Sequence, residues 1–221
     1  MGEEKHLPAD IDAQPPVRAA AALRSAIRGH REELEREQRL PKALVEQFHA
    51  AGFYSLVIPR ELGGLQADPL TYLRVVELLA EADGSVGWNL ANNSIGQLVT
   101  LGLPDEGVHE IYAHGADTVI AGTAVMGGGR AVPVDGGYRV TGRWPFGTGC
   151  QESAWMLSSF QILDGGEPRR SPDGASVYWR GVFERSEAQI VEGSWDVAGL
   201  RATGSFDWTV DDVFLPERRT M

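Results

Sequence analysis

The clearest structural signals of the chain lie between Thr118 and Trp155, where the sequence reads TVIAGTAVMGGGRAVPVDGGYRVTGRWPFGTGCQESAW. It opens with an apolar, β-prone run over residues 119–125 and breaks at the glycines of residues 127–129. Two more β-prone segments, 131–134 and 138–141, flank Asp135-Gly136-Gly137. An Asp-Gly turn between β-prone segments predicts a hairpin, because glycine adopts positive φ at little cost.

Residues 143–150, RWPFGTGC, follow this hairpin directly. Two large aromatics, a proline and two glycines leave little ordinary strand. One interpretation is an exposed backbone that a planar aromatic ligand approaches closely. The other is a twisted β-corner around a buried tryptophan, and composition alone favours this second interpretation.

The chain before residue 118 has a helical texture. Residues 1–16 are polar, contain three prolines and show no period, so we expect them to be disordered. From Val17 to Leu34 apolar residues recur every three or four positions, which predicts an amphipathic helix. Further helices are predicted over residues 41–51, 69–82, 86–101 and 104–114, and together they make residues 17–117 an all-α domain.

The predicted helix over residues 86–101, with Ser85 as its N-cap, is nearly uncharged. A helix without a solvated face is expected to be buried. It nevertheless carries Asn89, Asn92, Asn93, Ser94 and Gln97. Buried amides need hydrogen-bond partners, so the helix either packs on polar backbone or lines a cavity. Amides that cap neighbouring loops explain the pattern equally well.

After residue 117 the sequence changes to short apolar runs separated by Gly, Pro and Asp. Strands are predicted near residues 153–163, 176–183, 188–191 and 206–214, with a polar loop over residues 164–174. Several short strands at this spacing indicate a small antiparallel barrel or sandwich over residues 118–221. The predicted fold class is therefore multi-domain α+β.

Composition excludes several classes of function. A net charge of −11 argues against nucleic acid and anionic membrane surfaces as partners. No apolar run is long enough for a transmembrane helix, and no signal peptide is expected at the start. The single cysteine, Cys150, indicates a reducing, cytoplasmic location. Cys150 has no nearby histidine and no histidine has metal-ligand companions, so neither a cysteine nucleophile nor a metal site is expected.

Four motifs occur in an order that resembles the acyl-CoA dehydrogenase superfamily. They are LVIPRELGG at residues 56–64, DGGYRVTGRW at residues 135–144, GLRATGS at residues 199–205 and VFLP at residues 213–216. Within that superfamily, acyl-CoA dehydrogenases carry Thr-Glu-Pro-x-x-Gly-Ser-Asp after the first β strand, where this chain has TAVMGGGR at residues 123–130. The form WPFGTGC at residues 144–150 is similar to the two-component flavin monooxygenases.

This resemblance implies an enzyme that uses reduced FMN or FAD from a partner flavin reductase to oxygenate a small aromatic substrate. It implies flavin contacts by Thr123, Trp144, Phe146 and Thr148, with Ser85, Trp88 and Asn92 on the substrate side. A hydroxyl can hydrogen-bond a flavin ring atom, and an aromatic side chain can pack on the ring. The family also implies a homo-oligomer, a tetramer or a dimer.

One departure from the family leaves alternatives open. The family continues into a C-terminal four-helix bundle that carries the catalytic base, whereas this sequence stops at residues 216–221. We therefore assign no catalytic base and expect a half-built flavin site. The alternatives are an FAD-dependent acyl-CoA dehydrogenase and a non-catalytic truncated homologue that acts as a binding module.

Overall fold

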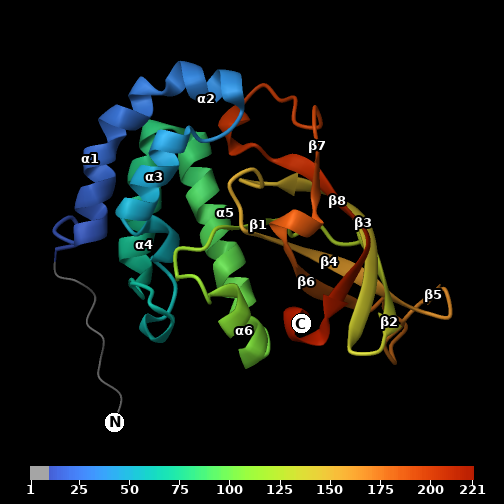
Figure 1. Cartoon of the computed structure of the whole chain (residues 1–221). Coiled ribbons are helices and arrows are strands. Elements are labelled where there is room, and N and C mark those ends of the chain that lie inside the picture. The colour runs from blue at the N-terminus through green and yellow to red at the C-terminus, as the bar shows by residue number, and fades with distance from the viewer. Residues whose placement is uncertain (1–9) are drawn as a thin grey trace, which may run out of the picture.

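A computed structural model describes residues 10–221, whose helices and strands form two adjoining halves (Figure 1). The expected disorder of residues 1–16 falls outside this range for residues 1–9. It was wrong for Pro15 and Pro16, which begin α1, and for Ile11, which packs against the helical core. The helical half contains α1 (Pro15–Gly29), α2 (Arg31–Glu37), α3 (Lys42–Ala50), α4 (Pro69–Ala82), α5 (Gly84–Thr100) and α6 (Asp105–Ile111). Its apolar core is built by buried residues from α1 to α5, among them Ile27, Leu44, Phe48 and Leu79.

Two details of the helices differ from the sequence-based prediction. The helix predicted from Val17 to Leu34 is two helices, α1 and α2, that meet at His30. Ile27 and Leu34 are both buried, so the apolar spacing continues through this bend and does not reveal it. Helix α5 begins at Gly84 and is capped by the Asp83 carboxylate, which accepts a hydrogen bond from Ser85 N at 2.8 Å. The N-cap prediction for Ser85 was therefore wrong by two residues.

The strand half is one curled sheet. Its strands are β1 (Ile120–Gly122), β2 (Gly129–Val134), β3 (Gly137–Gly147), β4 (Trp155–Asp164), β5 (Glu167–Pro168), β6 (Tyr178–Glu184), β7 (Gln189–Val191) and β8 (Phe206–Pro216). The sheet order is β1-β4-β2-β3-β8-β7, with β5 and β6 also paired to β4. The hairpin β2–β3 and the α+β class are confirmed. The sheet is mixed, because β1 and β2 both run parallel to β4.

Trp144 is the centre of the sheet's core. Its indole stacks on Trp208 with ring centroids 4.4 Å apart, and Nε1 donates to Ser159 O at 2.7 Å. A Cβ at Gly129 would lie 2.2 Å from this indole, so the glycine makes room for it. The register of β3 against β8 shifts between Trp144 and Gly147. The stretch 143–147 is thus a bulged strand around a buried tryptophan, as composition indicated.

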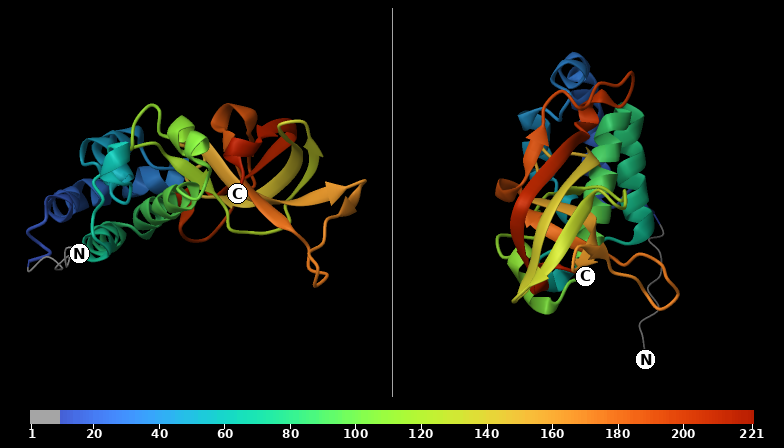
Figure 2. Two further views of the ribbon diagram at one scale, coloured as in Figure 1. Left: turned by 90° about the horizontal axis from the view of Figure 1, so that it is seen from below. Right: turned by 90° about the vertical axis from the view of Figure 1, so that its right-hand side faces the viewer.

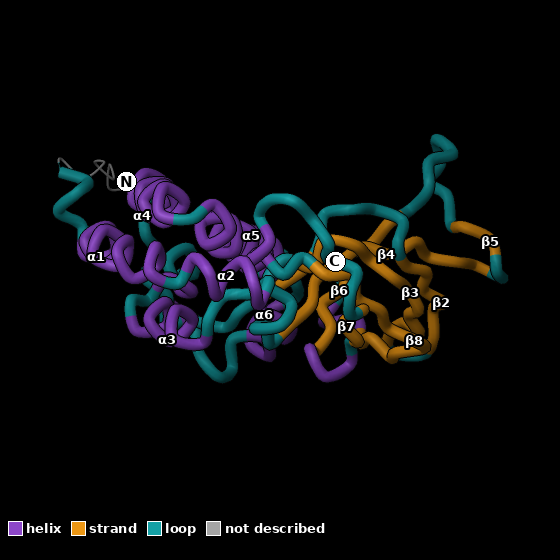
Figure 3. Tube along the Cα trace, turned by 90° about the horizontal axis from the view of Figure 1, so that it is seen from above, coloured by secondary structure: helices purple, strands orange, loops and turns teal. Residues whose placement is uncertain are grey.

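Helix α5 joins the two halves through its amides. Gln97 Nε2 donates to Thr118 O at 2.9 Å and also to Tyr54 O. Asn93 Nδ2 donates to Ile120 O at 3.3 Å, and Asn89 Nδ2 donates to Ala202 O at 3.1 Å. The helix therefore packs on polar backbone, and Figures 2 and 3 show it on the side of the helical half that faces the strands. The secondary structure changes between Ile111 and Ile120, while the division at residue 117 remains a prediction.

Candidate active site

A pocket that opens to solvent lies where α5 meets the sheet and has a volume of about 770 Å³. We call it the open pocket. This volume is within the usual range of about 300–1,000 Å³ for small-molecule sites. Apolar surface predominates in its lining. The lining residues are Trp88, Asn92, Ile95, Gly96, Val99, Gly122, Thr123, Ala124, Val125, Phe146, Thr148, Leu157, Arg180, Trp195, Leu200, Thr203 and Ser205.

One wall of the open pocket is a face of α5. Trp88, Asn92 and Ile95 follow each other at helical spacing, so their side chains share this face. Trp88 is 50% exposed and Ile95 is 56% exposed. The prediction that this helix has no exposed face was wrong. Its exposed face consists largely of apolar residues, so the lack of charged residues did not indicate burial. Large apolar side chains gathered beside a cavity are typical of a binding surface.

The opposite wall begins at the end of β1. A Cβ at Gly122 would lie 2.1 Å from Leu157 O, so only glycine allows β1 to approach β4 here. Thr123 follows at once, and its N donates to Leu157 O at 3.1 Å. Its hydroxyl oxygen accepts from Val125 N at 3.1 Å. Because that contact uses only a lone pair, the Thr123 O–H remains able to donate to a ligand.

Phe146 occupies a strained backbone position in the same wall. Its φ is 62°, which bulky residues rarely adopt, and its side chain is 53% exposed. The ring meets Trp195 edge-on, with centroids 6.3 Å apart. Leu200, at φ 54°, is a second pocket residue in the left-handed region. Strain of this kind costs about 1–3 kcal/mol per residue and concentrates at functional sites.

Three buried hydroxyls form the floor of the open pocket. Thr148 Oγ1 lies 2.8 Å from Ser205 Oγ, which in turn lies 2.7 Å from Thr203 Oγ1. We call these three side chains the hydroxyl trio. A backbone hydrogen bond holds two of them in place, because Gly149 N, next to Thr148, donates to Thr203 O at 2.9 Å. Either oxygen of each pair can be the donor, so the trio can present a donor or an acceptor to a ligand.

Five of the seven residues implied by the resemblance line the open pocket, namely Thr123, Phe146, Thr148, Trp88 and Asn92. Trp144 does not, because it is fully buried in the sheet core and its N–H is already bonded. Ser85 does not line the pocket either, since it is 5% exposed in the first turn of α5. We correct both assignments on this ground.

Sequence reasoning missed several pocket residues, among them Arg180, Trp195, Leu200, Thr203 and Ser205. The motif GLRATGS at residues 199–205 contains three of them. It supported the family resemblance, and it could also have indicated these site residues. Arg180 and Trp195 stand in segments with no distinguishing pattern. Only the packing of β6 and of the segment before η4 (Arg201–Thr203) brings them to the pocket.

Burial raises the pKa of the Cys150 thiol to about 11, so its thiolate is not available near neutral pH. Within residues 10–221 no group of three or more His, Cys, Asp or Glu side chains could hold a metal ion. Among the same residues, no helix combines the length and apolar composition that crossing a membrane requires.

Comparison with known proteins identifies the family. A family model described as acyl-CoA dehydrogenase, N-terminal domain, matches residues 17–105. Over 94% of its length the chain is 33% identical to the flavin-dependent monooxygenase, oxygenase subunit HsaA, of Mycobacterium tuberculosis. The crystal structure of that HsaA monooxygenase superposes with a TM-score of 0.85 at 30% identity, covering 95% of this chain and 52% of that one. The chain belongs to the acyl-CoA dehydrogenase superfamily.

Other superfamily members are similar over the same region. Indole-3-acetate monooxygenase of Pseudomonas putida is 32% identical over 85% of this chain and 46% of its own length. XiaF from Streptomyces sp., in complex with FADH2 and glycerol, has a TM-score of 0.84 at 28% identity and covers 93% of this chain and 50% of that one. The chain thus spans about half the length of the curated relatives that it matches.

Proposed function

We propose that this chain forms the flavin- and substrate-facing part of a flavin-dependent monooxygenase that acts on an aromatic compound. The observation that carries the proposal is the open pocket, where Phe146 and the hydroxyls of Thr123 and Thr148 line one cavity. The matched relatives support the monooxygenase branch, since their names are those of monooxygenases and hydroxylases. The proposal includes a separate reductase that supplies reduced FMN or FAD.

The residues present fit a flavin. An isoalloxazine ring is planar and largely apolar, with polar atoms along one edge. The pocket offers apolar walls from Trp88, Ile95 and Phe146, and the Thr123 and Thr148 hydroxyls at fixed positions. When bound, a reduced flavin supplies the electrons that activate oxygen. Thr123 and Thr148 would hold its polar edge, and Phe146 would pack against the ring.

The apolar α5 wall has two roles in this proposal. Trp88 and Ile95 would pack against an aromatic substrate, and Asn92 would offer it the amide of that wall. Asn92 Nδ2 already donates to Trp88 O at 3.2 Å, so its carbonyl oxygen stays free to accept. These side chains also keep water from the reacting atoms, which limits side reactions.

The exposed apolar residues continue beyond the pocket along α4 and α5 through Leu70, Leu73 and Leu98, which are 42%, 57% and 51% exposed. Several large apolar side chains exposed on neighbouring helices usually face another chain or segment. We infer that further polypeptide of the whole protein, or a second subunit, closes the pocket from this side. The oligomer and the domain division at residue 117 belong to this proposal.

The testing experiment uses the full-length gene product, with its intact mass measured first. FMN and FAD are titrated against it in both redox states, and a panel of phenols and indoles is offered with a flavin reductase, NADH and oxygen. We expect reduced flavin to bind and a reductase-dependent hydroxylated product to form. Desaturation of an acyl-CoA without a reductase would instead establish the acyl-CoA dehydrogenase alternative. No uptake of either flavin would establish the binding module.

A further inference from the structure

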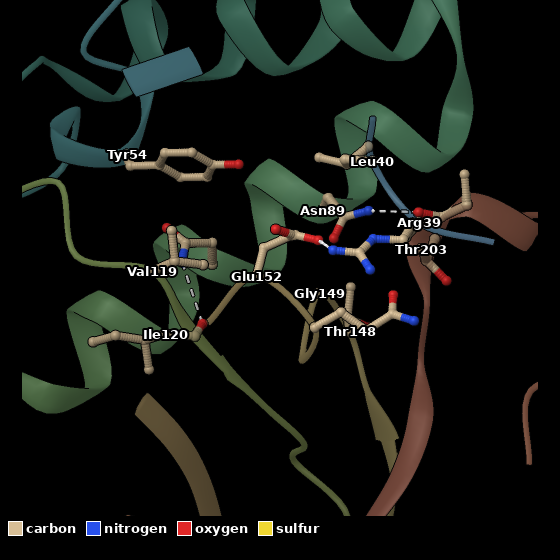
Figure 4. A pocket seen from close by; sticks show the side chains of 13 residues that line it. Arg39, Leu40, Tyr54, Asn89, Val119, Ile120, Thr148, Gly149, Glu152 and Thr203 are labelled. Atoms are coloured by element: carbon tan, nitrogen blue, oxygen red, sulfur yellow. Dashed lines mark hydrogen bonds and ion pairs between the residues drawn. The ribbon is translucent and has the colours of Figure 1, made fainter. Parts of the chain in front are cut away.

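A second, smaller cavity lies between the two halves, behind the floor of the open pocket. Its polar lining includes Arg39, Tyr54, Asn89, Asn93 and Glu152. Figure 4 shows Tyr54, Asn89 and the Arg39–Glu152 ion pair turned toward the same space. The cavity leaves about 10 Å³ for the centre of a water molecule, which is room for about one water.

An unpartnered amide oxygen points to an occupant of this buried cavity. Asn93 is 4% exposed, and its Oδ1 has no hydrogen-bond partner among the described residues, although its Nδ2 donates to Ile120 O. A buried acceptor without a donor costs about 1–3 kcal/mol. One water would supply that donor, and the other polar groups around the cavity give it the two to four partners that buried waters have.

The buried cavity and the open pocket share part of their walls. Thr148 and Thr203 line both, and Ser205 lies between them at hydrogen-bond distance from each hydroxyl. The trio is therefore a continuous chain of hydroxyls from the ligand site to the buried cavity. Each hydroxyl has one proton and two lone pairs, so each can accept a proton on one side and release one on the other.

The far side of the buried cavity reaches solvent through Glu152. This carboxylate pairs with Arg39, and its side chain is 20% exposed. Burial, and then the negative charge of Glu152, raise the pKa of Tyr54. Tyr54 therefore stays protonated and can donate to a water, and Glu152 is the carboxylate of this lining that borders both the buried cavity and solvent.

We propose that the buried cavity holds one ordered water, and that this water and the hydroxyls of Thr148, Ser205 and Thr203 carry protons between the open pocket and Glu152. The inference rests on the proposed function, because a flavin or its substrate supplies the proton. One bond to hydrogen breaks on the ligand and one O–H bond forms on Glu152. Every hydroxyl between them gains and loses one proton and keeps its charge.

The first test needs no flavin. A high-resolution crystal structure of the full-length protein should show one water within hydrogen-bond distance of Asn93 Oδ1 and of a hydroxyl of the trio. A dry cavity in the refined density would overturn the proposal. This readout does not depend on flavin binding. Its outcome therefore tests the buried water separately from the proposed function.

The second test follows proton movement with variants. Thr203→Val keeps the side-chain shape and removes the hydroxyl, so no extra water can replace it. Thr203→Val and Glu152→Gln should each slow the proton-coupled phase of reduced-flavin oxidation at least tenfold and change its solvent isotope effect. Thr203→Ser should restore both. The matched control is Ser153→Ala, because Ser153 is also buried but bonds Cys150 O away from the trio.

Flavin titration of each variant separates the two proposals. Unchanged flavin affinity together with a slowed phase supports the proton path. Unchanged affinity with unchanged rates and isotope effects in both Thr203→Val and Glu152→Gln overturns the path and leaves the proposed function intact. A wild-type protein that takes up no flavin refutes the proposed function. The crystal structure then tests by itself whether the buried cavity holds a water.

Discussion

At the scale of single residues, backbone conformation separates Phe146 from its neighbours. A Phe at φ 62° is unfavourable by itself, so the surrounding bulge must hold it there. Because its ring is half exposed and faces the open pocket, packing in the core does not explain the position. We interpret the strain as the cost of presenting an aromatic face to a ligand.

The two roles of Phe146 can be separated with a pair of variants. Phe146→Ala and Phe146→Gly both remove the ring and should both weaken flavin binding about tenfold. Only the glycine relieves the positive φ, so Phe146→Gly should be the more stable by about 1 kcal/mol. Chemical denaturation and flavin titration measure the two effects. Equal stability of the pair would show that the backbone position is unstrained.

Trp144 and Trp88 differ in burial, so substitutions at the two positions should differ in their effect on stability. Trp144→Phe removes the hydrogen bond to Ser159 O and leaves space in a fully buried site, so we expect a loss of about 2–4 kcal/mol in unfolding free energy. Trp88→Phe, at a half-exposed position, should cost less than about 0.5 kcal/mol. Equilibrium unfolding in urea measures both, and comparable losses would contradict the assignment of Trp144 to the core.

At the scale of elements, α5 organises the molecule. One face carries the amides that bond backbone from both halves, and the other carries the apolar wall of the open pocket. The sequence predicted a helix here, and its amides predicted polar partners. Which backbone groups they meet depends on residues about 20 to 110 positions away, so the pattern within the helix could not identify them.

Gln97 tests this role of α5. Gln97→Leu leaves the carbonyls of Tyr54 and Thr118 without their buried donor, so we expect a loss of about 2–3 kcal/mol. Leu98→Gln, at the adjacent exposed position, is the control and should be nearly neutral. Thermal and urea denaturation report the difference. A neutral Gln97→Leu would mean that water satisfies both carbonyls.

At the scale of the whole molecule, Arg219 ties the C-terminal residues to both halves. Its nearly buried guanidinium contacts Glu110 of α6, Glu184 at the end of β6, and Glu187. It also lies 4.9 Å from the ring centroid of Trp155. Burial raises the pKa of Glu110, but hydrogen bonds from Arg219 and Arg218 outweigh that effect and hold the pKa below the usual range of a glutamate.

This ion-pair network predicts a pH dependence. Because the folded pKa of Glu110 is lowered, its contribution to stability is complete above the unfolded pKa and is lost as pH falls through the folded one. We expect stability to decrease below about pH 4.5, and Glu110→Gln to reduce that decrease while costing about 1–3 kcal/mol at pH 7. Urea denaturation from pH 7 to pH 3 checks this. Parallel curves for both proteins would exclude Glu110 as a contributor.

Local periodicity, turn chemistry and short motifs were sufficient to predict the α+β class, the hairpin around Asp135-Gly136-Gly137, most helices and the superfamily. The folded chain was needed to reveal the parallel pairing of β1 and β2 with β4, the burial of Trp144 away from the open pocket, and the hydroxyl trio. Ser205 and Thr148 are 57 positions apart in the chain. Their contact depends on how β8 folds back on β3, which no local pattern encodes.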